Sequence, residues 1–220
     1  MAASTLLIID VQRAIDHPSW GDDRNNPDAE ANIARLLARW RERGWPVVHV
    51  RHASREPGST YRKGQPGFEF KAEVMPREGE RVVEKQTNSA FIGTNLQEQL
   101  EGVATLVIVG VITNNSVEAT ARMAGNLGFD TYVVADATAT FGRRDYDGRW
   151  RTAQEVHAMS LANLDGEYAR IVTTEEVLRW PYNSSTTSTK SATARCASPA
   201  ACLRSASTGL RKRGSSRSAI

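Results

Sequence analysis

Short runs of apolar and β-branched residues alternate along the chain with longer amphipathic segments. The strand-like runs are Thr5 to Ile9, Pro46 to Val50, Arg81 to Glu84, Thr105 to Val109, Thr131 to Ala135 and Ala169 to Val172. Strands that alternate with helices are typical of a parallel sheet with right-handed crossovers. The pattern therefore predicts an α/β fold, namely a Rossmann-like, doubly wound sheet of about six parallel strands with helices on both faces.

Capping residues and glycines set the expected limits of the helices. Asn26-Pro27 is typical of a helix start, and Gly44 of a helix end, around an apolar stripe at helical spacing. Thr94 with Gln97, and Thr173 with Glu176, have the spacing of capping boxes. A further helix is expected from about 151 to 164. The segment after the second strand is rich in Pro and Gly and too long for one turn, which indicates an excursion near a site.

The charge pattern divides the chain into a domain of residues 1–180 and a tail of residues 181–220. The tail holds seven basic residues and no acidic one, so removing it changes the net charge from +3 to −4. It is rich in Ser and Thr and poor in large aliphatic residues, so we expect it to be disordered. A basic tail that touches nucleic acid or anionic lipid is one interpretation, but a vector-derived or read-through extension is favoured.

Several classes of protein are not favoured by the composition. The longest apolar run, Val103 to Ile112, is too short to span a bilayer, so no membrane association is expected. The first residues show no leader pattern, which predicts a cytoplasmic protein. Because the basic charge belongs to the tail, nucleic acid is not an expected partner of the domain. Both cysteines, Cys196 and Cys202, also lie in the tail.

Three polar residues fall at the carboxyl ends of predicted strands, where α/β sheets bind ligands. They are Asp10, Lys85 and Ser116, the last at the start of a helix. A carboxylate, an ammonium and a hydroxyl beside backbone N–H groups are the parts of a general base, a charge partner and a nucleophile. Each also has a plainer interpretation, as a turn residue, a solvated lysine and a helix cap.

No motif for a nucleotide or a metal accompanies these residues. The chain has no GxGxxG, no phosphate-binding P-loop and no GxSxG elbow. The four histidines have no metal-ligand spacing. We therefore expect neither a cofactor nor a metal ion, and a small molecule as the substrate.

Three separated motifs resemble the isochorismatase-like cysteine hydrolases. They are Leu-Ile-Ile-Asp-Val-Gln at 7–12, Glu-Lys at 84–85 with Ser-Ala-Phe at 89–91, and residues 110–124, Gly-Val-Ile-Thr-Asn-Asn-Ser-Val-Glu-Ala-Thr-Ala-Arg-Met-Ala. Segments 136–140 and 156–164 add to the likeness, which extends over about residues 4–178. The resemblance implies a Rossmann-like hydrolase fold, a homo-oligomer, and a pocket near a subunit contact.

The resemblance also implies roles for individual residues. Asp10 and Lys85 match the aspartate and lysine of an Asp-Lys-Cys triad, but Ser116 stands at the position of the nucleophilic cysteine. A thiol reaches its ionised form more readily than a hydroxyl does, so Ser116 needs a base in contact, for which Asp10 is the candidate. The resemblance further implies a cis peptide at Val111–Ile112 and an oxyanion hole formed by the N–H groups of Ile112 and Ser116.

Four explanations of Ser116 remain open. The chain is a serine hydrolase with Asp10 as base, an engineered Cys-to-Ser variant, a catalytically silent small-molecule binding protein, or an enzyme that needs no nucleophile. The last has a counterpart in the resembled family, in which isochorismatases cleave a vinyl ether with the aspartate as acid. We favour hydrolysis of a small amide, imide or related C–N bond.

The expected pocket walls are aromatic residues in loops and at strand ends, together with Asn115. Arg51, Arg143 and Arg144 are candidates for holding a carboxylate, although exposed arginines are usually only solvated. Nicotinamidase-like members carry an Asp/His metal cluster after the second strand, which residues 51–55 do not reproduce, so no zinc is expected. The candidate pocket residues are Trp20, Tyr61, Phe68, Phe91, Asn115 and Phe141.

Overall fold

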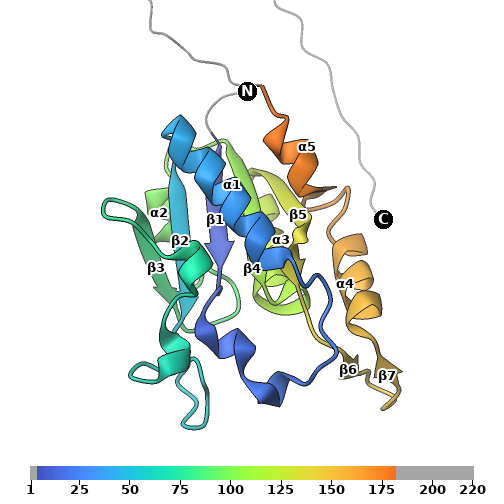
Figure 1. The fold of residues 1–220 in the computed structure, drawn as a ribbon. Helices are drawn as coiled ribbons and strands as arrows, with labels where there is room; N and C mark the ends of the chain where they lie inside the picture. Colours follow the sequence, from blue (N-terminus) through green and yellow to red (C-terminus); the bar gives the residue numbers. More distant parts are fainter. Residues whose placement is uncertain (1–3, 182–220) are drawn as a thin grey trace, which may run out of the picture. The chain divides into compact units, whose positions relative to one another are not determined.

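The computed structural model describes residues 4–181 and contains a six-stranded sheet (Figure 1). The sheet order is β3-β2-β1-β4-β5-β8, and every neighbouring pair is parallel. The predicted sheet is therefore confirmed, whereas the predicted disorder of 181–220 lies, apart from Pro181, outside the described residues. The strands are β1 (Thr5–Ile9), β2 (Val47–His52), β3 (Arg81–Lys85), β4 (Thr105–Val111), β5 (Asp130–Ala139) and β8 (Arg170–Val172).

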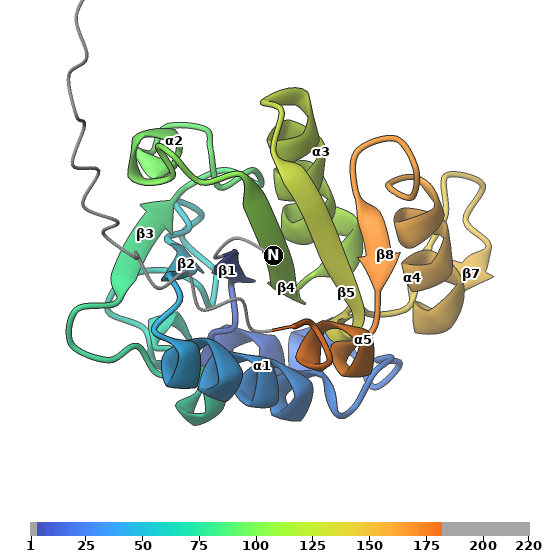
Figure 2. The same ribbon diagram turned by 90° about the horizontal axis from the view of Figure 1, so that it is seen from above.

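Helices cover both faces of the sheet, as the sequence predicts (Figure 2). One face carries α1 (Ala29–Arg43) and α5 (Thr174–Leu178), and the other carries α2 (Leu96–Gln99) and α3 (Glu118–Asn126). The helix α4 (Ala153–Ala162) adds Leu161 to the α2 and α3 face. No helix within 4–181 has the length and apolar character needed to cross a membrane.

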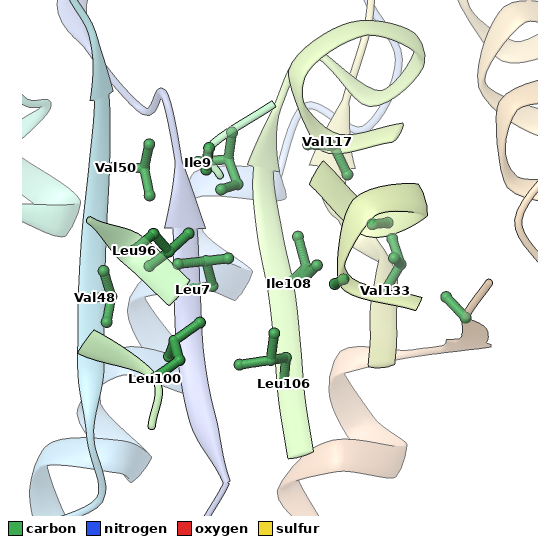
Figure 3. Packing of buried hydrophobic residues seen from close by; sticks show 14 of the residues in the cluster. Leu7, Ile9, Val48, Val50, Leu96, Leu100, Leu106, Ile108, Val117 and Val133 are labelled. Carbon is green, nitrogen blue, oxygen red and sulfur yellow. The ribbon is translucent and has the colours of Figure 1, made fainter. Parts of the chain in front are cut away.

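Alternation of side chains along the strands produces two buried layers. In β1, Leu7 and Ile9 belong to the cluster beneath α2 and α3, while Leu6 and Ile8 face α1. Figure 3 shows the first cluster, in which Leu96 and Leu100 meet the strand residues. A parallel strand covered on both faces is apolar at every position, which explains why the sequence of β1 has no polar member facing solvent.

Of the expected helix starts, two were wrong and one is confirmed. The helix α1 begins at Ala29 rather than at Pro27, because Asn26 adopts a left-handed φ of 45° and its amide donates to Ala135 O (2.8 Å) and Thr138 O (2.7 Å). The second capping box, at Thr173 and Glu176, is confirmed. The first is not formed: the hydroxyl of Thr94 donates to Ala90 O at 2.6 Å, and Asn95 precedes the helix α2.

The β5 strand is longer than expected, and a small hairpin follows it. A register shift opposite Gly110 lets β5 continue to Ala139, where the pattern predicted an end at Ala135. The antiparallel pair of β6 (Arg143–Arg144) and β7 (Trp150–Arg151) was not expected from the sequence. Two-residue strands are too short to produce a recognisable alternation of apolar and polar positions.

Gly110 of β4 packs closely against the backbone of Ile9 in β1. Its φ is +124°, and a Cβ at this position would lie 2.1 Å from Ile9 O and 2.7 Å from Ile9 N. Only glycine satisfies both constraints. Since Ile9 is followed directly by Asp10, this contact also positions the carboxyl end of β1.

Replacing this glycine tests the close approach. We expect Gly110→Ala to lower the free energy of unfolding by about 3–5 kcal/mol, because a backbone clash adds to the left-handed strain. Gly58→Ala is the control, since a Cβ at Gly58 meets nothing within 4 Å and its φ is not left-handed. Urea denaturation of both variants is the measurement, and equal midpoints would contradict the expected clash.

Glu80 connects α1, β2 and the turn before β3. Its carboxylate accepts from Arg41 Nε (2.6 Å), from Arg77 N (2.9 Å) and from His49 Nε2 (2.8 Å). Burial acts to raise the pKa of the Glu80 carboxyl, but these hydrogen bonds outweigh it and lower the pKa from 4.5 to about 2. The carboxylate therefore stabilises the fold above the unfolded-state pKa, and this contribution is lost as the pH falls toward 2.

The pH dependence of unfolding tests this linkage. Between about pH 5 and pH 2.5, we expect Glu80→Gln to lose less unfolding free energy than the parent, because it has no carboxyl to protonate. Glu101→Gln, which removes an exposed carboxyl, is expected to follow the parent curve. Urea unfolding at a series of pH values measures the difference, and parallel curves for Glu80→Gln and the parent would contradict it.

Candidate active site

The three predicted polar side chains meet at the carboxyl edge of the sheet. Asp10 follows β1, Lys85 ends β3, and Ser116 lies in a π-helical turn, Thr113–Val117, that follows β4. The ammonium of Lys85 donates to Asp10 Oδ2 at 2.6 Å, to Ser116 Oγ at 3.1 Å and to Thr87 O at 3.1 Å. These three bonds use all of the N–H groups of a charged lysine, so the ammonium is held in one place.

The ion pair is almost completely removed from solvent. The side chain of Lys85 is 0% exposed and that of Asp10 is 5% exposed. The second carboxylate oxygen, Asp10 Oδ1, is buried and has no hydrogen-bond partner within residues 4–181. Buried polar atoms are usually paired, so this carboxylate oxygen is available to receive a ligand or a proton.

A cavity of about 200 Å³ opens beside these residues. Asp10 and Ser116 line it, and so do Trp20, Tyr61 and Asn115, which were predicted as pocket residues. Val111 and Ile112 provide the adjoining backbone. Sites for drug-sized ligands occupy about 300–1,000 Å³, so a cavity of this volume suits a smaller molecule.

Three aromatic residues predicted for the pocket lie elsewhere. Phe91 stacks on Phe129 at 6.0 Å and packs against the cluster beneath α2 and α3. Phe68 is covered by the guanidinium of Arg51 at 4.5 Å. Phe141 does not line the cavity, but it stacks on Trp20 at 5.4 Å and so supports that wall from behind.

Three further lining residues were missed by sequence reasoning. They are His52, Ser59 and Asn88. His52 ends β2, so the rule that selected Asp10 and Lys85 at strand ends would also have selected it. Ser59 and Asn88 lie in irregular segments that carry no comparable signal in the sequence.

Gln12 connects the first two strands beneath the cavity. Its Oε1 accepts from the N–H of His52 at 2.7 Å, and its Nε2 donates to the carbonyls of His52 (3.1 Å) and Phe68 (2.8 Å). The side chain is fully buried. One amide therefore holds the end of β2 and the following excursion against the segment that carries Asp10.

The turn that carries Ser116 is anchored on both sides. The Val111–Ile112 peptide bond is cis, at the position that the resemblance implies. Ile112 O accepts from Asn115 N at 3.0 Å and from Val117 N at 3.3 Å, which forms the π-helical turn. The hydroxyl of Thr113 is hydrogen-bonded to His157 Nδ1 of α4 at 2.9 Å, and burial lowers the pKa of that imidazole.

Neither a metal cluster nor the larger hollow on the described chain competes with this cavity. No group of three His, Cys, Asp or Glu side chains within 4–181 is arranged to hold a metal ion. A larger hollow of about 990 Å³ lies over α4 and the β6–β7 hairpin, lined in part by Arg143 and Met159. It touches none of Asp10, Lys85 and Ser116, so the smaller cavity is the candidate active site.

The chain is thus a doubly wound α/β protein with a buried Asp-Lys pair and a hydroxyl at the ends of its strands. The isochorismatase domain model matches residues 4–176, and the chain belongs to the isochorismatase family of hydrolases. A solved isochorismatase-family structure from Chromobacterium violaceum is 58% identical, has a TM-score of 0.78, and the match covers 80% of this chain and 92% of that one.

Curated relatives extend the same likeness. The isochorismatase family protein YrdC of Bacillus subtilis is 46% identical over 175 residues, covering 79% of this chain and 93% of the relative. Nicotinamidase 3 of Arabidopsis thaliana is 31% identical over 163 residues, covering 67% of this chain and 77% of the relative. The family and the fold that the motifs indicated are therefore confirmed.

The buried ion pair has a measurable energetic consequence. We expect Lys85→Met and Asp10→Asn each to lower the unfolding free energy by about 3–5 kcal/mol, because each leaves a buried polar partner uncompensated. The double variant is expected to lose less than the sum of the two. A double-mutant cycle in urea measures this coupling.

The exposed pair of Arg39 and Glu42 on α1 is the matched control, with side-chain exposures of 36% and 67%. Its coupling is expected to be less than about 1 kcal/mol. Additive losses at Asp10 and Lys85 would show that the two side chains do not form the buried pair in solution.

Proposed function

We propose that this hydrolase cleaves the C–N bond of a small amide, imide or related molecule in the 200 Å³ cavity, with Ser116 as nucleophile. The observation that carries the proposal is the position of Lys85 Nζ between Asp10 Oδ2 and Ser116 Oγ, with Asp10 Oδ1 unpaired. A base, a fixed positive charge and a nucleophile are thereby joined in one hydrogen-bonded group.

Lys85 acts in this scheme as a fixed charge. All three of its N–H groups are donated, so the ammonium has no lone pair with which to take a proton. Because Ser116 Oγ accepts from Lys85, the serine hydrogen points toward another acceptor. Ser116 Oγ and Asp10 Oδ1 share no direct hydrogen bond, so one water carries the proton from Oγ to Oδ1 as Oγ attacks the carbonyl carbon. Negative charge developing on Oγ lies 3.1 Å from the Lys85 ammonium.

The remaining steps use groups of the same turn. The backbone N–H groups of Ile112 and Ser116 stabilise the oxyanion of the tetrahedral intermediate. When the C–N bond breaks, the leaving nitrogen takes the proton from Asp10, and an acyl-Ser116 ester remains. Water then attacks this ester while Asp10 accepts its proton, and the carboxylic acid leaves as Ser116 regains its hydrogen.

Two features support an amide-type substrate. The relative from Arabidopsis thaliana is named a nicotinamidase, and an amide is cleaved by the attack described above. The cavity also has the small volume that such a molecule requires. A silent binding protein and a nucleophile-free reaction at Asp10 are the competing functions, and both are outcomes of the test below.

The nucleophile is tested with Ser116→Cys, Ser116→Ala and Asp10→Asn, all with Cys196 and Cys202 replaced by serine so that a new thiol is unique. On a panel of small amides, we expect Ser116→Cys to hydrolyse faster than the parent, because a thiolate forms more readily. Ser116→Ala is expected to be inactive, and Asp10→Asn to lose about 10²–10⁴-fold in rate. Product formation and intact mass, which detects the acyl adduct, are the measurements.

Each competing function has its own signature in this experiment. Full activity of Ser116→Ala with loss in Asp10→Asn would establish a reaction that needs no nucleophile. Binding of the amides without adduct or turnover in any variant would establish a silent binding protein. Unfolding midpoints of all variants serve as the control for loss of structure.

A further inference from the structure

The ring of His52 differs from the other three imidazoles of the chain. His49 Nε2 is bonded to Glu80 at 2.8 Å, His157 Nδ1 to Thr113 at 2.9 Å, and His17 Nδ1 to Ser19 Oγ at 2.8 Å. Neither ring nitrogen of His52 has a hydrogen-bond partner within residues 4–181, and its Nδ1 is buried. A half-buried imidazole in a cavity without a protein partner is expected to receive a ligand.

The backbone of His52 is held firmly although its ring is unpaired. Gln12 binds both its N–H and its carbonyl, at 2.7 Å and 3.1 Å. In the sheet His52 is in register with Lys85, and its ring meets the ring of Tyr61 edge to face at 5.7 Å. The imidazole is therefore fixed at the cavity wall beside the Asp10–Lys85 pair.

The ionisable groups lining the cavity provide no free positive charge. They are Asp10, His52 and Tyr61, and no arginine or lysine is among the described lining residues. Burial and then the charge of Lys85 lower the pKa of His52 below 6.5, against the opposing effect of Asp10. Burial and the carboxylates of Asp10 and Asp16 raise the pKa of Tyr61. At neutral pH both rings are uncharged.

The arginines considered for binding a carboxylate are engaged elsewhere. Arg51 pairs with Glu84 at 3.4 Å and covers Phe68, while Arg143 and Arg144 belong to the hairpin beside α4. The positive charge of Lys85 is already balanced by Asp10. A substrate carboxylate in this cavity would face the Asp10 carboxylate and leave its own charge unpaired, which is costly.

We propose that the cavity selects uncharged carboxamide-type substrates over carboxylates, and that His52 is the residue that hydrogen-bonds the substrate and enforces this selection. The inference rests on the proposed function, because it concerns the same cavity. A neutral imidazole has one donor and one acceptor, which match the carbonyl and N–H of an amide. A carboxylate provides acceptors only, so it satisfies at most the donor.

The experiment measures binding and turnover separately, with matched pairs of probes. Acetamide with acetate, and benzamide with benzoate, differ within each pair only in the charged group. Affinities of the full chain for each are measured by ligand-observed NMR titration at about pH 7.5, where His52 is neutral. We expect at least one amide to bind, about tenfold or more tightly than its acid.

Two substitutions at His52 separate hydrogen bonding from shape. His52→Phe keeps a flat ring without polar atoms, and is expected to weaken amide binding about tenfold. His52→Gln keeps one donor and one acceptor, and is expected to restore most of that loss. Because the pKa of His52 is lowered below 6.5, the benzoate titration is repeated at stepwise lower pH. Once His52 is protonated, the added positive charge beside Asp10, Lys85 and Tyr61 should make benzoate bind the parent more tightly than at pH 7.5.

The rise in benzoate affinity at lower pH should be absent from His52→Gln, because glutamine cannot be protonated. If His52 had only a structural role, the parent and His52→Gln would show the same pH dependence. Equal affinity for acids and amides, unchanged amide binding in His52→Phe, or no binding by any amide would overturn the inference. Amide binding that depends on His52, without turnover, would instead overturn the proposed hydrolysis and leave this inference standing.

Discussion

The contact between Lys85 Nζ and Asp10 Oδ2, at 2.6 Å and almost without exposure, is the constraint on which the site depends. Two charges are removed from water together, which is tolerable only when each is closely paired and hydrogen-bonded. The order of the strands makes this possible, because β1 and β3 flank β2, so that Asp10 just after β1 and Lys85 at the end of β3 lie at the same edge. The sheet thus holds the Lys85 ammonium in place beside the hydroxyl of Ser116.

Close packing also fixes the ends of the strands beside this ion pair. Gly110 allows β4 to approach Ile9 closely, and the register shift in β5 occurs opposite that glycine. The turn that carries Ser116 begins directly beyond this point. The close packing of β1 against β4 therefore also fixes the candidate site, since a shift of either strand would move Asp10 relative to Ser116.

The sequence predicted the sheet well, because β1 and β4 are apolar after their first threonine and the amphipathic stripe of α1 has a clear period. Asp10, Lys85 and Ser116 were found because they follow strands, and His52 could have been found likewise. The aromatic walls were less predictable: Phe91 and Tyr61 look alike in a loop, and only tertiary packing sends one beneath a helix and the other into the cavity. The start of α1 was misjudged because Asn26 bonds to β5, a contact over a hundred residues away in the chain.

The amide of Gln12 binds three backbone groups on two separate segments, which bears on how far the residues lining the cavity can change. The excursion between β2 and β3 supplies Ser59 and Tyr61 to the wall, yet it is attached to the segment after β1 through backbone groups that any amino acid provides, among them the carbonyl of Phe68. Loops of other composition can therefore be exchanged here, provided that they keep the backbone hydrogen bonds to residues 11–13 as well as the bond to the side chain of Gln12. Redesign of the substrate range should begin with residues 54–66 and leave Gln12 and Gly67 unchanged, because a Cβ at Gly67 would lie 2.4 Å from Thr60 O and 3.1 Å from Ala14 Cα.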